Sequence, residues 1–192
     1  MSELPLIAVT DSATCPRPLA EQIERLAKLT ELRPQAVILR AKALDKAAYR
    51  TLALQAQQSC EAAGIQLILH SDWQLARELS ISMLHLPLAL LRQISEYERA
   101  YFTWLSTSVH SVGEAQEAQA LGATVLIAGH IYTTQCKAGL APRGLSFLRA
   151  VCSVISLPVY AIGGISFDAA QHAELQANGA RGACVMSAYM RL

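Results

Sequence analysis

Charged residues and long apolar runs are scarce in this 192-residue sequence. Lys, Arg, Asp and Glu together make up 16% of it, the formal net charge is +1, and the basic residues do not cluster. A nucleic-acid-binding surface needs clustered Lys and Arg, so we expect a small-molecule partner and no nucleic acid. No apolar run approaches the roughly 20 residues that cross a bilayer, which argues against insertion into a membrane.

The cysteines and the first residues bear on the compartment. The five cysteines are an odd number without a C-x-x-C pair, which predicts reduced thiols rather than a disulfide framework or a zinc site; they are Cys15, Cys60, Cys136, Cys152 and Cys184. The opening residues, MSELPLIAVTDS, lack the basic region of a secretory signal. We therefore expect a cytoplasmic protein.

What the sequence does contain is an alternation of short apolar runs with longer segments of helical spacing. Eight apolar runs predict strands, at residues 6–9, 36–39, 66–69, 82–86, 102–106, 124–128, 158–162 and 182–186. Capping signals separate them: Ser111 with Glu114 starts one helix, and glycines such as Gly64 follow the last helical residues. Strands that are apolar throughout are typical of a parallel sheet buried on both faces.

Eight such units predict a single α/β domain over residues 1–192, a compact TIM (β/α)8 barrel. A doubly wound sheet is the alternative, but no G-x-G-x-x-G follows the first strand. Only SAYMRL remains after the eighth predicted strand, so the final helix must be truncated or absent. A full final helix would cover apolar surface beside the first strand, and we therefore expect a homodimer in which a second subunit covers part of it.

In TIM barrels the chemistry lies at the carboxyl ends of the strands. Gly163 and Gly164 follow the seventh predicted strand. Met186 is the last residue of the eighth predicted strand, and Ser187 follows it. Main-chain N–H groups at these two positions predict a phosphate-binding site. A simple glycine-rich turn is the alternative.

Five stretches carry a family resemblance: VILRAK (37–42), SVHS (108–111), GHIYTTQCKAGLAPRG (129–144), VYAIGGIS (159–166) and VMSA (185–188). In this order and spacing the sequence resembles the thiamine phosphate synthase/TenI superfamily over nearly its whole length. The resemblance implies a TIM barrel that binds a thiazole phosphate. One branch couples this compound to a pyrimidine pyrophosphate with magnesium, and characterised members of the TenI branch are thiazole tautomerases.

Two positions separate the branches. The synthase has an Asn-Asp pair where this sequence has His70 and Ser71, and an acidic residue where it has the apolar stretch 87–90. Because magnesium prefers carboxylate oxygens, we expect no metal site and no cofactor. After the sixth predicted strand, His130 stands where the synthase has a proline, and the loop that follows is similar to TenI.

The resemblance to TenI implies that His130 is the catalytic acid/base of a metal-independent thiazole tautomerase, an isomerase. One imidazole with a pKa near ~6.5 can remove and return a proton at neutral pH. The candidate substrate-binding residues are Arg40, Ser108, Thr134 and Lys137. Two alternatives stay open: a non-catalytic protein that binds thiazole or thiamine phosphate as a regulator, and a divergent thiamine phosphate synthase.

Overall fold

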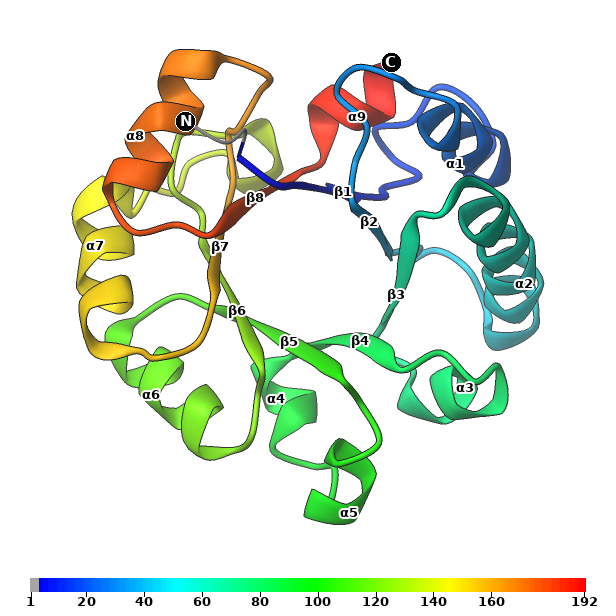
Figure 1. Ribbon diagram of the computed structural model, residues 1–192, viewed down its shortest axis with the longest axis horizontal. Coiled ribbons are helices and arrows are strands. Elements are labelled where there is room, and N and C mark those ends of the chain that lie inside the picture. Colours follow the sequence, from blue (N-terminus) through cyan, green and yellow to red (C-terminus); the bar gives the residue numbers. More distant parts are fainter. Residues whose placement is uncertain (1–3) are drawn as a thin grey trace.

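The strands form a closed barrel in sequence order, in a computed structural model that describes residues 4–192 (Figure 1). Every neighbouring pair is parallel, and β8 closes the ring by pairing with β1. The strands are β1 (Leu6–Val9), β2 (Ala36–Leu39), β3 (Gln66–His70), β4 (Met83–Pro87), β5 (Trp104–Val109), β6 (Val125–Gly129), β7 (Val159–Ile162) and β8 (Gly182–Val185). The predicted TIM barrel is confirmed, and closure of the ring excludes the doubly wound sheet.

The helices form an outer ring around the strands (Figure 1). They are α1 (Leu19–Ala27), α2 (Lys46–Ala63), α3 (Trp73–Glu78), α4 (Leu88–Leu91), α5 (Glu96–Arg99), α6 (Val112–Ala120), α7 (Gly144–Val154), α8 (Ala169–Ala177) and α9 (Ser187–Arg191), with a 3-10 turn at Gln135–Lys137. The predicted caps occur: the Ser111 side chain accepts from the Glu114 N–H, and Gly64 ends α2 in the left-handed region. None of these helices in the described chain is long and apolar enough to span a bilayer.

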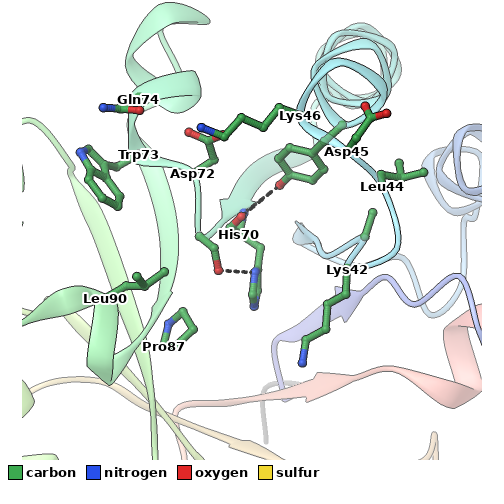
Figure 2. A pocket seen from close by; sticks show the side chains of 13 residues that line it. Lys42, Leu44, Asp45, Lys46, His70, Asp72, Trp73, Gln74, Pro87 and Leu90 are labelled. Atoms are coloured by element: carbon green, nitrogen blue, oxygen red, sulfur yellow. Dashed lines mark hydrogen bonds between the residues drawn. The ribbon is translucent and has the colours of Figure 1, made fainter. Parts of the chain in front are cut away.

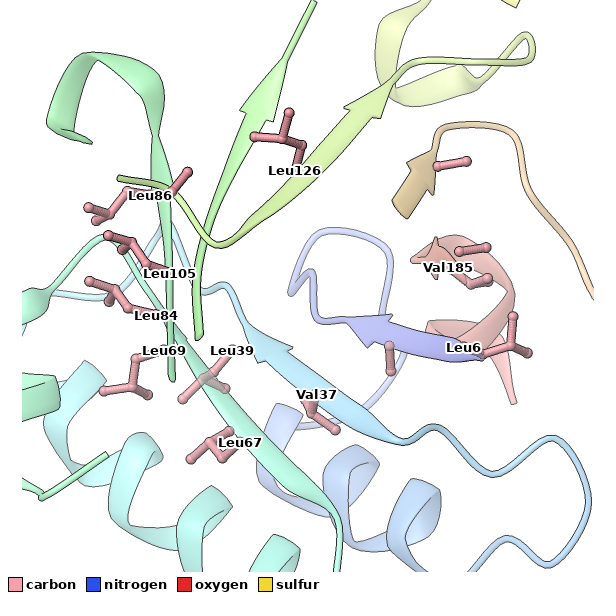
Figure 3. Packing of buried hydrophobic residues seen from close by; sticks show 14 of the residues in the cluster. Leu6, Val37, Leu39, Leu67, Leu69, Leu84, Leu86, Leu105, Leu126 and Val185 are labelled. Carbon is pink, nitrogen blue, oxygen red and sulfur yellow. The ribbon is translucent and has the colours of Figure 1, made fainter. Parts of the chain in front are cut away.

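The core has two layers because successive side chains of each strand point to opposite faces. The larger cluster lies between the strands and the helices, and Figure 3 shows leucines and valines of several strands contributing to it. The second cluster includes Ile7, Ile38, Ile68 and Ile127 and lies inside the barrel. Burial on both faces is the reason why the strands read as continuous apolar runs.

The carboxyl-terminal helix is a stub of five residues, as predicted. Tyr189 and Met190 of this helix are buried, and the Tyr189 ring packs edge-on against Phe167 with 4.9 Å between centroids. The Gln22 side chain donates to the Tyr189 carbonyl at 2.5 Å, which ties α9 to α1. The stub therefore covers part of the apolar surface itself, and the homodimer stays a prediction.

One strand boundary differs from the prediction in a way that matters for the site. The fifth strand runs from Trp104 to Val109, whereas the sequence predicts 102–106. The apolar pattern misses the polar half of this strand, because Ser106 and Ser108 are inward-facing residues that contact another polar side chain rather than a hydrophobic one. Ser108 thus lies on the inner wall of the barrel and not on a loop.

Candidate active site

The predicted site residues all lie near the carboxyl ends of the strands, at one mouth of the barrel. They come from the loop after β2 (Arg40), β5 (Ser108), the loop after β6 (His130, Thr134, Lys137), the loop after β7 (Gly163, Gly164) and the N-cap and first residue of α9 (Met186, Ser187). A closed parallel barrel brings these ends together although they are far apart in sequence. This placement agrees with the prediction, but no ligand-binding role follows from it alone.

Gly163 and Gly164 are required by close packing between the loops after β6 and β7. Both have positive φ, 102° and 68°. A Cβ on Gly163 would lie 2.3 Å from the Cβ of His130, and one on Gly164 would lie 2.5 Å from the Thr133 carbonyl oxygen. The loops are further joined by a hydrogen bond from the Tyr132 N–H to the Gly163 carbonyl at 3.0 Å. Loop packing thus accounts for both glycines, and phosphate binding there stays a prediction.

His130 is buried, with 9% of its surface exposed. Its Nε2 lies 3.4 Å from the Leu140 carbonyl oxygen, in the loop that follows β6, and its own carbonyl accepts from the Arg143 N–H at 3.0 Å. The residue is therefore held beneath its own loop at both the ring and the main chain. A general acid/base must reach its substrate, so this packing does not favour the proton-transfer role that the resemblance to TenI implies.

Thr134 and Lys137 belong to the same short 3-10 turn, in which the Lys137 N–H donates to the Thr134 carbonyl at 3.1 Å. Lys137 is exposed and Thr134 is half-buried. Neither side chain forms a hydrogen bond with another residue of the described chain. Lys137 can therefore approach an anion at the mouth only from this loop.

Arg40 is anchored to β1. Its guanidinium pairs with the Asp11 carboxylate, and its backbone N–H donates to the Thr10 hydroxyl at 2.7 Å. The Thr10 hydroxyl donates in turn to the Arg40 carbonyl at 2.9 Å. The Arg40 side chain is 24% exposed, so part of it remains accessible while its position is fixed. An arginine held in this way is suited to binding a phosphate oxygen.

A cavity of about 470 Å³ lies beside these residues, at the carboxyl ends of β2, β3 and β4. Figure 2 shows Lys42 on one side of it and Trp73, Pro87 and Leu90 on the other, with His70 between them. The cavity contains none of the predicted catalytic, substrate-binding or phosphate-binding residues. Its size fits a small aromatic ligand, with an apolar wall on one side and a cation on the other.

The His70 side chain is fixed in this cavity. Its Nδ1 lies 2.7 Å from the Ser71 hydroxyl, and its backbone N–H donates to the Tyr49 hydroxyl at 3.1 Å (Figure 2). The same phenol donates to the Leu39 carbonyl at 2.8 Å and so connects β2 with β3. Burial, together with the positive charges of Arg40 and Lys42, lowers the pKa of His70 to about 4. His70 is thus neutral at physiological pH.

A second histidine lies deeper. His85 of β4 is fully enclosed, with Nδ1 3.0 Å from the Ser106 hydroxyl and Nε2 3.1 Å from the Ser108 hydroxyl. Its ring centroid is 5.4 Å from that of His70. Burial and the neighbouring His70 lower the pKa of His85 to about 3. Both nitrogens of a neutral imidazole are therefore hydrogen-bonded inside the barrel.

The donor groups at this mouth do not fit magnesium. His70, Ser71 and Pro87 stand at the ends of β3 and β4, and imidazole is a poor ligand for this cation. The Asp72 carboxylate accepts from the Leu75 N–H at 2.9 Å as the cap of α3. Within residues 4–192, no three His, Cys, Asp or Glu side chains converge on a point that could hold a metal ion.

Several residues of the site are not evident from the sequence. His85 has the spacing of a structural strand residue, and Tyr49 and Trp73 belong to helical patterns. Strand alternation is the one signal that could have found His85: residues 83, 85 and 87 share a face, and so do 104, 106 and 108. Strand alternation does not predict that β4 pairs with β5, and this pairing is what places His85 opposite Ser106.

The closed eight-stranded parallel barrel, with polar groups at the carboxyl ends of its strands, defines a TIM-barrel protein. A solved thiamine phosphate pyrophosphorylase from Pyrococcus furiosus has the same fold, with a TM-score of 0.79, 24% identity, and coverage of 98% of this chain and 88% of that one. A family model described as thiamine monophosphate synthase matches residues 6–189. The chain belongs to this family.

Curated relatives agree on the family name. A thiamine-phosphate synthase of Lactococcus lactis subsp. cremoris is 34% identical over 143 residues, which cover 71% of this chain and 63% of that protein. One of Syntrophomonas wolfei subsp. wolfei is 29% identical over 196 residues, covering 98% of this chain and 90% of that protein. The match to the Lactococcus protein thus spans less than two thirds of its length.

These relatives correct one prediction. The assignment to the isomerases is wrong, because the relatives are named thiamine-phosphate synthase, and synthases of this kind are transferases. The resemblance to TenI came from one loop, whereas the matches extend over most or all of the barrel. A tautomerase role for His130 has no support from these relatives, and the catalytic role of this residue stays a prediction.

Proposed function

We propose that the protein is a divergent thiamine-phosphate synthase, a transferase that joins a thiazole phosphate to a pyrimidinylmethyl diphosphate at the carboxyl mouth of its barrel. The observation that carries the proposal is the family match over residues 6–189. The cavity beside the mouth supports it, because it combines an apolar wall for a flat ring with cations for a diphosphate. No proton-transfer step on the thiazole is part of this reaction.

In the proposed reaction the thiazole nitrogen supplies an electron pair to the methylene carbon of the pyrimidine. A C–N bond forms while the C–O bond to diphosphate breaks, and the diphosphate leaves with the electron pair of that bond. Negative charge therefore grows on the leaving oxygen. Arg40, fixed by Asp11, and the exposed Lys42 are the chain's own groups that can stabilise this charge.

The thiazole phosphate is proposed to bind on the other side of the mouth. Gly163 and Gly164 follow β7, Ser187 begins α9, and their main-chain N–H groups are the proposed phosphate donors, with Lys137 on the loop after β6 as a further cation. Successive main-chain N–H groups at positive-φ glycines are suited to binding a phosphate, and both Gly163 and Gly164 have positive φ. This arrangement leaves the two substrates facing each other across the barrel axis.

A second candidate is a protein that binds these phosphates without turnover. It is favoured by the donor groups at β3 and β4, which do not fit the magnesium that the family resemblance implies. If Arg40 and Lys42 do not neutralise the leaving group sufficiently, the mouth retains binding and loses transfer.

The test is to incubate the protein with both substrates and to quantify thiamine phosphate by chromatography. Synthase activity predicts product that falls at least ~10-fold in Lys42→Met, because one cation is lost from the charge-stabilising group. Lys28→Met is the matched control, since Lys28 is an exposed lysine that ends α1 and lies outside the mouth. Saturable binding of both compounds without product would instead establish the binding protein.

A further inference from the structure

We propose that the protein has a second ligand site at the amino-terminal end of the barrel, in the crevice between α2 and the segment that joins α3 to β4, and that this site binds an uncharged single-ring heteroaromatic alcohol. The site lies at the opposite end of the strands from the carboxyl mouth. The ligand class follows from the residues that line the crevice. The choice of a thiazole alcohol as the probe rests on the proposed function.

The crevice lies between two neighbouring helices of the outer ring, α2 and α3 (Figure 1). Polar side chains of α2 bridge it: the Arg50 guanidinium donates to the Glu78 carboxylate at 3.0 and 2.6 Å, and the Gln57 amide donates to the Leu79 carbonyl at 3.3 Å. Beside the Gln57 contact, a cavity of about 220 Å³ extends to the first residues of β3 and β4. This volume is below the ~300–1,000 Å³ of sites for drug-sized ligands, so the cavity fits a molecule of one ring.

The floor of the cavity is apolar. Four of its lining residues are buried: Cys60, Ile65, Leu67 and Ile81. Burial and the neighbouring Glu61 carboxylate raise the pKa of the Cys60 thiol to about 11, so the thiol is uncharged at physiological pH. Met83 is half-buried and also lines the cavity, and a thioether sulfur makes favourable contacts with aromatic rings. The floor therefore suits a flat aromatic ring.

The rim of the cavity is polar and offers both a hydrogen-bond acceptor and a donor. The Gln57 amide donates its N–H to Leu79, and its oxygen has no hydrogen-bond partner within residues 4–192. The exposed Ser80 hydroxyl is also without a partner in that part of the chain. A hydroxyl group of a ligand both donates and accepts, so it can donate to the Gln57 oxygen and accept from Ser80. The rim therefore matches an alcohol.

The charge of the rim disfavours a phosphate ester of the same ring. Among the described residues that line the cavity, Glu61 is the only charged one. A phosphate in the cavity would meet this carboxylate and no compensating cation, which opposes binding. The carboxyl mouth has the opposite character, because Arg40 and Lys42 lie there. The two ends of the barrel thus distinguish a ring alcohol from its phosphate ester.

The site is tested with a methylthiazole that carries a hydroxyethyl group, and with the phosphate ester of this alcohol. In calorimetric titration the alcohol should bind saturably with a dissociation constant below about 1 mM, and an excess of the ester should not displace it. Carbon-13 NMR of methyl groups locates the bound alcohol: signals of Ile65, Ile81 and Met83 should shift, whereas that of Ile131, after β6, should not. Absence of saturable binding, displacement by the ester, or shifts confined to the mouth would overturn the proposal.

Two variants test the lining residues. Gln57→Leu removes the free amide oxygen and should weaken binding of the alcohol about tenfold, the equivalent of one hydrogen bond. Gln66→Trp places a large side chain at an exposed position of the rim and should abolish binding by filling the cavity. Gln58→Leu is the matched control, because Gln58 is the exposed neighbour of Gln57 on α2 and does not line the cavity. Wild-type affinity in either Gln57→Leu or Gln66→Trp would contradict the proposal.

Selection against the phosphate is tested by reversing the charge of the rim. In the wild type the ester should need at least ~10-fold more ligand than the alcohol to shift the methyl signals of the crevice. Glu61→Lys supplies a cation and should reduce this difference to about threefold or less. Equal binding of the two compounds by the wild type, or an unchanged difference in Glu61→Lys, would refute the proposed selectivity. Binding of the alcohol by a protein that forms no thiamine phosphate would leave this site standing and refute the transferase.

Discussion

The Nε2 atom of His85 and the hydroxyl of Ser108 are 3.1 Å apart on neighbouring strands, 23 residues apart in the sequence. Together with Ser106 they form a polar centre inside a barrel whose interior cluster is mainly apolar and includes Ile38, Ile68 and Ile127. A fully buried polar group persists where its hydrogen bonds are made. The hydrogen bonds of His85 therefore affect the free energy of unfolding of the protein.

The buried His85 makes the stability of the protein depend on pH. Its pKa is lowered to about 3 in the folded state, against about 6.5 in the unfolded chain. Between these values the unfolded state binds more protons, so the free energy of unfolding falls as the pH falls through 6.5. The contribution lost between pH 7 and pH 5 is about 2 kcal/mol.

Urea denaturation of the wild type and His85→Gln at several pH values measures this contribution. The free energy of unfolding of the variant should change less between pH 7 and pH 5, because glutamine does not titrate. His172→Gln is the control: this histidine is on α8 and its ring contacts the Ser166 carbonyl near the surface. An identical pH slope for the wild type and His85→Gln would contradict the assignment of a neutral buried ring.

The unpaired hydroxyl of Thr107 predicts a stabilising substitution. The side chain is fully buried, and its oxygen has no partner among the described residues. Thr107→Val replaces the hydroxyl with a methyl group of similar shape, and the free energy of unfolding should rise by about 1 kcal/mol. Thr10→Val is the comparison, because the Thr10 hydroxyl bonds the Arg40 backbone at both its N–H and its carbonyl. That variant should lose about 2 kcal/mol, and a loss of stability in Thr107→Val would show that its hydroxyl is satisfied.

Gly163 should be intolerant of any side chain. A Cβ at this residue would lie 2.3 Å from that of His130, and its φ is 102°. Overpacking and backbone strain add, so Gly163→Ala should lower the free energy of unfolding by about 3 kcal/mol. Gly139→Ala is the matched control, with φ 82° and no atom within 4 Å, and should cost about 1 kcal/mol. Chemical denaturation measures the free energy of unfolding of both variants. An equal decrease in the two would mean that the loops after β6 and β7 can separate to make room for the side chain.

Introducing the Asn-Asp pair of the synthase branch at residues 70 and 71 tests the lack of fit to magnesium. In the double substitution His70→Asn and Ser71→Asp, the mouth gains a carboxylate at the end of β3. Residue 71 has φ 70°, a conformation that Asp adopts more readily than most residues. Calorimetric titration should detect Mg²⁺ binding in the double variant and none in the wild type. Mg²⁺ binding by the wild type at millimolar concentrations would contradict this prediction.

The fold was predictable from the sequence because each unit carries its own signal. The first two strands occupy the predicted residues, 6–9 and 36–39, since side chains buried on both faces must be apolar at every position. Gly64 ends α2 where the pattern places it, because only glycine adopts a left-handed conformation without strain.

The candidate site was only partly predictable. Lys137, Arg40 and the glycines after β7 lie at the predicted mouth, because the carboxyl end of each strand is a local property. His85 could not be assigned in this way, since its role depends on which strand lies beside β4 and in what register. The buried position of the His130 ring likewise depends on the path of a loop that closes over it.

The amino-acid sequence by itself therefore determined the eight β/α units, their order and the end of the barrel at which polar groups collect, because these depend on burial and turn chemistry within short segments. The tertiary structure alone decided which polar groups meet. Hydrogen bonds form between atoms about 3 Å apart, and the pairing of β4 with β5 brings His85 to Ser106 and Ser108 across some 20 residues of intervening chain.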